Sequence, residues 1–334
     1  MKQTLIGIGI GIGAWLCSTA ALAQSSVSVY GIVDTGMLAE RGGPGGAITK
    51  LNSGIASSSR LGFRGREDLG GELAAVWVIE NGFNADTGTI GQGGVLFGRQ
   101  AYAGLSGRFG AVTLGRQYTP YYRTLRDVGD PFAAVSLAGR AGNLMALNTR
   151  ADNLVQYISP AIGGVRADVA YGAGEVAGDS SKNRTLSGSL GYANGALALQ
   201  TAHHRIDNPA GTDRVRHTLV AASYRFSRLK AYVSHARNRG LASADSHDTL
   251  AGVALPFGRH KVMLSHVRHD DRAAANQDAR QWGVGYQFAL SKRTDLYAAY
   301  AAIHNERGAG FTVGTASDRG GGDRATNLGL RHSF

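Results

Sequence analysis

The chain has 334 residues, including 49 glycines and 6 prolines, and 43 % of it is hydrophobic, which excludes a disordered or a collagen-like protein. It carries 35 basic and 24 acidic residues, and the formal net charge of +11 fits nucleic acid, an anionic membrane surface or anionic solutes as partners. Six of the basic residues are lysine and the other 29 are arginine, and the positions of the arginines in the strand pattern matter more for function than their number.

The first 23 residues are predicted to be a secretory signal, which leaves residues 24–334 as the exported protein. Lys2 precedes an apolar run over residues 5–16, and Ala21-Leu22-Ala23 is a small-x-small cleavage site. The only cysteine, Cys17, lies in the part that is removed, so an exported chain without disulfides is expected. Residues 14–16 lack the small residue that precedes a lipoprotein cysteine, and no lipid anchor is predicted.

The rest of the chain reads as about 16 strands. Residues 280–290 show the pattern most clearly, because Trp282, Val284 and Tyr286 alternate with glutamine and glycine, and the same period of two recurs at 165–171, 186–192, 218–226, 293–303 and 324–334. Short turns such as Asn194-Gly195 alternate with long polar connections, and all six prolines lie in connections. No apolar run reaches 18 residues, so a membrane-spanning helix is not expected.

These strands favour an all-β fold, a closed antiparallel transmembrane barrel with long loops at one end. A soluble β-sandwich also alternates and is the competing interpretation. Against it, strands of about 9–11 residues suit a tilted membrane crossing, and aromatic residues such as Tyr171, Tyr224 and Phe334 sit towards strand ends on the apolar face, as interfacial girdles do. Closure also removes the exposed edges that a large sandwich would have to protect.

One long stretch, from Tyr118 to Arg150, does not alternate. A connection of this length in a compact protein is usually functional or disordered, and this one carries enough apolar side chains to pack, among them Tyr121, Phe132 and Leu144. The prediction is that residues 119–149 fold into the barrel and narrow its bore.

Several segments resemble the general trimeric porins of β-proteobacteria, of the Neisseria, Bordetella and Burkholderia type. The resemblance covers nearly the whole exported chain and is carried by SVSVYGIVDTG (26–36), SRLGFRGREDLGGELAAVWVIENGF (59–83), LFGRQAYAGLSGRFGAVTLGRQ (96–117), YQFALSKRTDLYAAY (286–300) and GLRHSF (329–334). It implies a 16-stranded barrel, a homotrimer in the outer membrane, a third loop folded into the lumen, contact with outer-membrane lipid and lipopolysaccharide, and recognition of Phe334 by the barrel-insertion machinery.

A passive channel needs a constriction whose charges sort ions. With Leu61 and Phe63 facing lipid, alternation turns Arg60 and Arg64 into the lumen, where they avoid the cost of roughly 2–4 kcal/mol for a charge in the lipid core. The resemblance implies that Arg99, Arg116 and Arg150 also line the constriction, although for Arg116 alternation alone would point outwards unless a bulge intervenes.

The loop would contribute Asp127 and Asp130 opposite this basic wall, and opposed walls would create a transverse field. The same loop carries Arg123, Arg126 and Arg140 beside these aspartates. The expected function is passive diffusion of small hydrophilic solutes, anionic or neutral, with a preference for anions; Arg60 and Arg99 are expected to matter most. The resemblance has two departures. Asp130-Pro131-Phe132 replaces a more glycine-rich segment of some relatives, and Gln156 occupies a lumen position that is often basic.

The sequence does not favour a metal site or an enzyme. His203-His204 and the pair His266 and His269 could suggest a metal, but adjacent strand residues face opposite sides and no cysteine or glutamate cluster accompanies them. No catalytic triad, cofactor site or nucleic-acid module is expected. A substrate-tuned porin, a barrel enzyme and a plugged structural barrel remain as alternatives. Channel conductance would separate a porin from the last two. Replacement of Arg99 by alanine, which is expected to reduce the anion preference, would separate a tuned constriction from a passive one.

Overall fold

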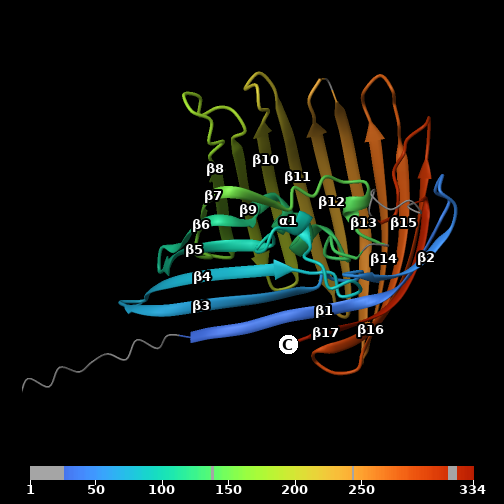
Figure 1. The fold of residues 1–334 in the computed structure, drawn as a ribbon, viewed down its shortest axis with the longest axis horizontal. Coiled ribbons are helices and arrows are strands. Elements are labelled where there is room, and N and C mark those ends of the chain that lie inside the picture. Colours follow the sequence, from blue (N-terminus) through green and yellow to red (C-terminus); the bar gives the residue numbers. More distant parts are fainter. Residues whose placement is uncertain (1–25, 137–138, 243, 315–321) are drawn as a thin grey trace, which may run out of the picture.

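The computed structural model describes residues 26–136, 139–242, 244–314 and 322–334, so the predicted signal segment lies outside the described residues. The chain forms one antiparallel sheet closed into a barrel (Figure 1). Its first strands are β1 (Ser26–Arg41), β2 (Ile48–Ser53), β3 (Arg60–Gly70), β4 (Leu73–Gly82), β5 (Gln100–Gly107), β6 (Gly110–Tyr118), β7 (Arg150–Ile158) and β8 (Val165–Gly172). The remaining strands are β9 (Thr185–Asn194), β10 (Leu197–Asp207), β11 (Arg214–Phe226), β12 (Leu229–Arg239), β13 (Asp245–Phe257), β14 (His260–Asp271), β15 (Ala279–Ala289), β16 (Thr294–Asn305) and β17 (Arg324–Ser333).

Closure is made by the two ends of the chain. β1 pairs with β17 from Ile32 opposite Ser333 to Arg41 opposite Arg324. On its other side β1 pairs with β3 near its start and with β2 near its end, so β2 and β3 share one strand position. The seventeen strands therefore occupy sixteen positions around the barrel, which confirms the predicted fold.

The break between β2 and β3 is held from inside the barrel by Asp34. Its carboxylate accepts hydrogen bonds from the backbone N–H groups of Ile55 (3.1 Å), Ala56 (3.0 Å) and Ser57 (2.7 Å), and from the Tyr297 hydroxyl (2.6 Å). Buried backbone donors need partners, and this carboxylate supplies them. The turn is thereby fixed on the inner wall immediately before β3 begins.

Burial alternates along the strands as the sequence predicts. In β15, Trp282 and Val284 are about half exposed on the outer face, whereas Gln281 is fully buried on the inner face. The predicted aromatic residues Tyr171, Tyr224 and Phe334 are also exposed on the outer face. Two-residue turns join strands at one end, as between β11 and β12, and longer connections lie at the other, which is the extracellular end in barrels of this kind.

The segment between β6 and β7 covers residues 119–149, and it contains α1 (Pro120–Thr124), the π-helical turn η2 (Leu125–Gly129) and the 3₁₀ turn η3 (Ala141–Asn143). A further 3₁₀ turn, η1 (Gln92–Gly94), lies between β4 and β5. Figure 1 shows α1 and the chain that follows it within the ring of strands. Within the described residues, no helix is long and apolar enough to cross a membrane.

Candidate functional site: an arginine-lined passage

The inward segment, residues 119–149, begins with a capped helix. Thr119 has extended backbone angles, and its hydroxyl oxygen accepts a hydrogen bond from the Tyr122 N–H (3.1 Å), as an N-cap does. The same hydroxyl donates to the Asn148 carbonyl (2.6 Å), and Pro120 occupies the first helical position. Because this cap joins the two ends of the segment, the segment leaves and re-enters the barrel wall at one place.

Apolar packing docks the segment on the inner wall. Tyr121 and Leu125 are fully buried in one cluster with the wall residues Ala202, Leu219 and Leu250. These wall residues are apolar although they face the lumen, because the segment covers them. Burying side chains of this size stabilises the docked position by roughly 1.5–3 kcal/mol each.

Polar contacts tether the far part of the segment to the same wall. The Asn143 side-chain amide donates to the side-chain oxygen of Gln281 (2.7 Å), and the Gln281 side-chain amide donates to the Arg140 backbone carbonyl (3.1 Å). The Ser265 hydroxyl donates to the Gly139 carbonyl (3.2 Å). Each contact satisfies a polar group that would otherwise be buried alone, so the segment has a defined position across the lumen.

Asp130 does not face the passage, in contrast to the prediction. It is 2 % exposed, and its carboxylate accepts hydrogen bonds from the N–H groups of Phe132 (2.8 Å), Ala134 (3.0 Å) and Ala141 (2.9 Å). Burial raises the pKa of this carboxyl to about 6, because desolvation outweighs the three hydrogen bonds. Asp130 holds the fold of the segment together.

Asp127 lies on the segment as predicted, but its charge is balanced by its neighbour. The Arg126 guanidinium donates two hydrogen bonds to it, at 2.6 and 2.9 Å. Arg126 also lies over the rings of Tyr118 and Tyr122, 5.3 and 5.6 Å from their centroids. The inward segment therefore lacks the acidic face that a transverse field would require.

The passage beside the segment is instead lined by arginines from both sides. A cavity of about 480 Å³ lies between the segment and the wall formed by β1, β3, β7 and β17. The wall and the chain leading into β5 contribute four arginines and the segment two, namely Arg60, Arg99, Arg150, Arg331, Arg126 and Arg140. No carboxylate lines this cavity among the described residues.

Three of these arginines are balanced by a carboxylate. Arg126 is paired with Asp127, as described above. The buried Arg99 donates to the buried Glu80 (2.7 Å), whose other oxygen accepts from the Tyr30 hydroxyl (2.8 Å). Arg331 donates to Asp295 at 2.8 and 3.0 Å.

Arg60, Arg150 and Arg140 have no carboxylate in salt-bridge distance within the described part of the chain. Arg60 donates to the Ser57 hydroxyl (3.3 Å) and Arg150 to the Tyr118 hydroxyl (3.0 Å). Arg140 donates to the Asn143 side chain (3.1 Å) and to the Gly314 carbonyl (3.3 Å). The cavity consequently has an excess of three positive charges, contributed by both of its walls.

The other two predicted arginines lie elsewhere. Arg64 faces the lumen two inward positions beyond Arg60 on β3, where its guanidinium lies 5.3 Å from the Tyr30 ring centroid, and it does not line the cavity. Arg116 pairs across the strands with Ala101, in the outward row of the exposed Leu114. Its guanidinium donates to the Gly98 carbonyl (2.8 Å) and to Asp152 (2.6 Å), so the structure does not bring it to the passage.

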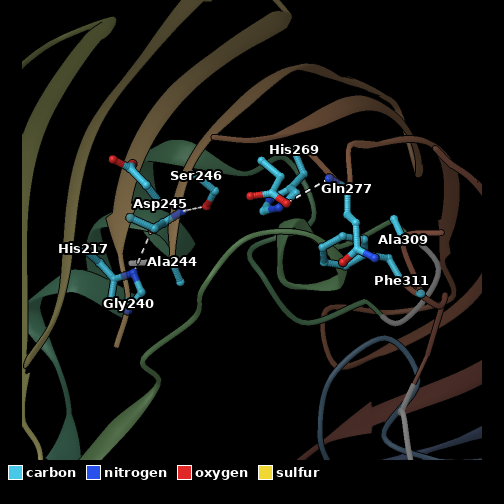
Figure 2. A pocket seen from close by; sticks show the side chains of 12 residues that line it. His217, Gly240, Ala244, Asp245, Ser246, His269, Gln277, Ala309 and Phe311 are labelled. Carbon is cyan, nitrogen blue, oxygen red and sulfur yellow. Dashed lines mark hydrogen bonds between the residues drawn. The ribbon is translucent and has the colours of Figure 1, made fainter. Parts of the chain in front are cut away.

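A vestibule of about 500 Å³ lies on the inner wall at the extracellular ends of β11–β14 (Figure 2). Beside it, the His217 ring nitrogen is hydrogen-bonded to the Asn238 side-chain oxygen (2.8 Å), and the Asn238 amide donates to Asp248 (2.6 Å). The Asp248 carboxylate also accepts from the His269 ring nitrogen (2.6 Å). Phe311 closes one side, with its ring 4.8 Å from that of His269.

A closed barrel with an apolar outer face, long loops at one end and an inward segment beside a charged passage is a membrane diffusion channel of the porin class. The chain belongs to the Gram-negative porin family, which matches residues 12–308. It is 31 % identical to outer membrane porin protein 32 of Delftia acidovorans and 26 % identical to major outer membrane protein P.IB of Neisseria meningitidis serogroup B, each over the full length of both chains.

Solved structures agree with this assignment. The anion-selective porin from Comamonas acidovorans is 30 % identical and superimposes with a TM-score of 0.81, covering 93 % of this chain and 100 % of that one. The loop L8 deletion mutant of OmpT from Vibrio cholerae, at 17 % identity and a TM-score of 0.69, shares the fold. The protein is an outer-membrane porin of a Gram-negative bacterium, as its sequence predicts.

Two members of the site were not anticipated. Arg331 is next to the apolar Leu330, so alternation in the last strand could have placed it in the lumen. Glu80 follows the outward Ile79 in the same way, and a lumen-facing glutamate opposite β3 could have been proposed as a partner for an arginine. Their proximity to the other residues depends on barrel closure, which no local pattern shows.

Proposed function

We propose that this porin prefers anions, and that the cavity between residues 119–149 and the wall is its constriction. The observation that carries the proposal is the excess of three positive charges from Arg60, Arg140 and Arg150. Fixed charges at a narrow, water-filled point attract counter-ions and repel ions of like charge. The name of the Comamonas relative, an anion-selective porin, supports the same preference.

The solutes we propose are small hydrophilic molecules, anionic or neutral, that cross by passive diffusion. Each of the six arginines donates to at least one polar acceptor within the protein, so the cavity attracts anions without enclosing one. A substrate-tuned porin would hold its solute tightly enough for the solute to reduce the ion current at low concentration. Titration of the open channel with phosphate, sulfate and small organic anions separates the two.

We also propose that the protein acts as a homotrimer and is inserted through recognition of Phe334. The backbone of Phe334 pairs with Gly31 in both directions at 3.1 Å, and the residue is 44 % exposed on the outer face, where a partner can reach it. Contact with lipopolysaccharide around the barrel is part of the same proposal.

Purified protein in a planar bilayer under a potassium chloride gradient tests the proposal. Openings in groups of three with a reversal potential that favours chloride are expected. Open channels that favour potassium would refute the anion preference. A folded protein that opens no channel would favour the plugged structural barrel or the barrel enzyme.

A further inference from the structure

Tyr118 lies where the barrel wall and the inward segment meet. It is the last residue of β6, it pairs across the strands with Arg150 at the start of β7, and it immediately precedes Thr119, the cap of α1. Its ring stacks on that of Tyr122, with the ring centroids 5.2 Å apart and an interplanar angle of 21°. Strand pairing, the helix cap and the stacked ring thus fix this side chain where it lines the cavity beside the segment.

The phenol of Tyr118 holds three arginines of the passage together. Its hydroxyl oxygen accepts hydrogen bonds from Arg99 (2.6 Å) and from Arg150 (3.0 Å). The guanidinium groups of Arg150 and Arg126 lie over its ring, 4.6 and 5.3 Å from the centroid, where the ring face attracts a cation. Arg150 depends most on this contact, because its Nε is buried without a partner and its side chain makes one hydrogen bond within the described residues, the one to Tyr118.

The proton of the same hydroxyl is not used by the protein. A hydroxyl has two lone pairs and one proton. The two arginines occupy the lone pairs, and no acceptor for the proton lies within hydrogen-bond distance among the described residues. Cationic donors on the oxygen polarise the O–H bond, which makes it a stronger donor. A solute in the cavity therefore meets a strengthened hydrogen-bond donor between two guanidinium groups.

We propose that the Tyr118 hydroxyl donates a hydrogen bond to a passing anion, and that this contact makes the channel favour carboxylates over anions that are weak hydrogen-bond acceptors. The excess charge of Arg60, Arg140 and Arg150 attracts every anion, and charge alone does not distinguish two monovalent anions of similar size. A directional donor does distinguish them, because a carboxylate oxygen accepts strongly and a perchlorate oxygen weakly. Tyr118 is thus a specificity-determining residue, and this inference rests on the proposed anion preference.

The test measures the permeability of acetate relative to perchlorate, from the reversal potential of single trimers with the potassium salt of one anion on each side. Tyr118→Phe removes the hydroxyl and keeps the ring that lies under Arg126. Loss of one hydrogen bond to the passing carboxylate should lower the acetate-to-perchlorate ratio about fivefold. A tyrosine that only positioned the arginines would behave differently, since its loss frees a donor on Arg99 and on Arg150, and the ratio would stay the same or rise.

Two further proteins serve as controls. Tyr232→Phe makes the same change at a tyrosine of the inner wall that packs against Phe132 and does not line the cavity, and it should leave the ratio unchanged. Replacement of Tyr118 by 3-fluorotyrosine, which has nearly the same size and a stronger donor, should raise the ratio.

An acetate-to-perchlorate ratio for Tyr118→Phe that equals or exceeds that of the wild type would overturn the proposal. An equally large fall for Tyr232→Phe would also overturn it, because the effect would then not depend on the passage. The failure of the proposed function looks different: it is a wild-type reversal potential in potassium chloride that favours potassium.

Discussion

Replacement of Arg150 by glutamine should reduce the anion preference about fivefold. The side chain lines the passage, and its charge is not balanced by a carboxylate. A monovalent anion that passes about 5 Å from this charge gains roughly 0.8 kcal/mol in water, and screening at 0.1 M salt reduces this to about 0.5 kcal/mol. A cation loses the same amount, so the difference is about 1 kcal/mol, or roughly fivefold in the ratio of permeabilities.

The assay is the reversal potential of single trimers under a potassium chloride gradient. Arg150→Gln should move it towards zero, and Arg60→Gln, which removes the charge opposite the segment on β3, should have a similar effect. The double variant should lose about 25-fold, since the two charges act independently on a passing ion. Arg228→Gln, at an exposed periplasmic turn, serves as the control and should leave the reversal potential unchanged.

An unchanged reversal potential for Arg150→Gln, in channels that keep their conductance and their grouped openings, would refute this reasoning. It would mean that the narrowest point for ions lies away from the cavity beside residues 119–149. The vestibule around His217 would then be the next place to examine.

Three further outcomes are expected. Arg99→Ala should lower the unfolding temperature, measured by the heat-dependent mobility shift on a gel, because Glu80 stays buried without its ion-pair partner at a cost of about 3–5 kcal/mol. A second substitution, Glu80→Gln, in the same chain should restore most of the lost stability. Tyr121→Ala should loosen the inward segment by roughly 3–5 kcal/mol and give larger, noisier step conductance. Asp130 has a pKa raised from 3.8 to about 6, so the stability linked to its protonation is present at low pH and is lost between about pH 4 and 6. The loss amounts to roughly 3 kcal/mol. Profiles of the unfolding temperature against pH should show it in the wild type and not in Asp130→Asn.

Strand alternation is a local property, and it was sufficient to predict the barrel. It placed Arg60 inside because Leu61 must face lipid, and the structure agrees. It also defined the inward segment, whose bounds at residues 119–149 match the interval between β6 and β7.

The charges of the passage could not be predicted in this way. Whether Arg99 acts on an ion depends on Glu80, a residue on a neighbouring strand, and whether Asp130 faces water depends on how the segment folds back on itself. At Arg116, the pairing of β6 with β7 shifts register between Gly115 and Gln117, yet the arginine stays in the outward row. Tertiary contacts decide these cases, and a single sequence does not contain them as a local pattern.

The same alternation separates the arginines into two populations with different physical tasks. Those turned inwards, such as Arg60 and Arg150, line the passage, and no carboxylate of the described residues lies within ion-pair distance of them. Those turned outwards, such as Arg216 and Arg268, lie on the outer face near the extracellular ends of β11 and β14. A one-residue shift of register on β11 or β14 would exchange the two surfaces, so the strand pairing of the barrel decides which arginines face the lumen.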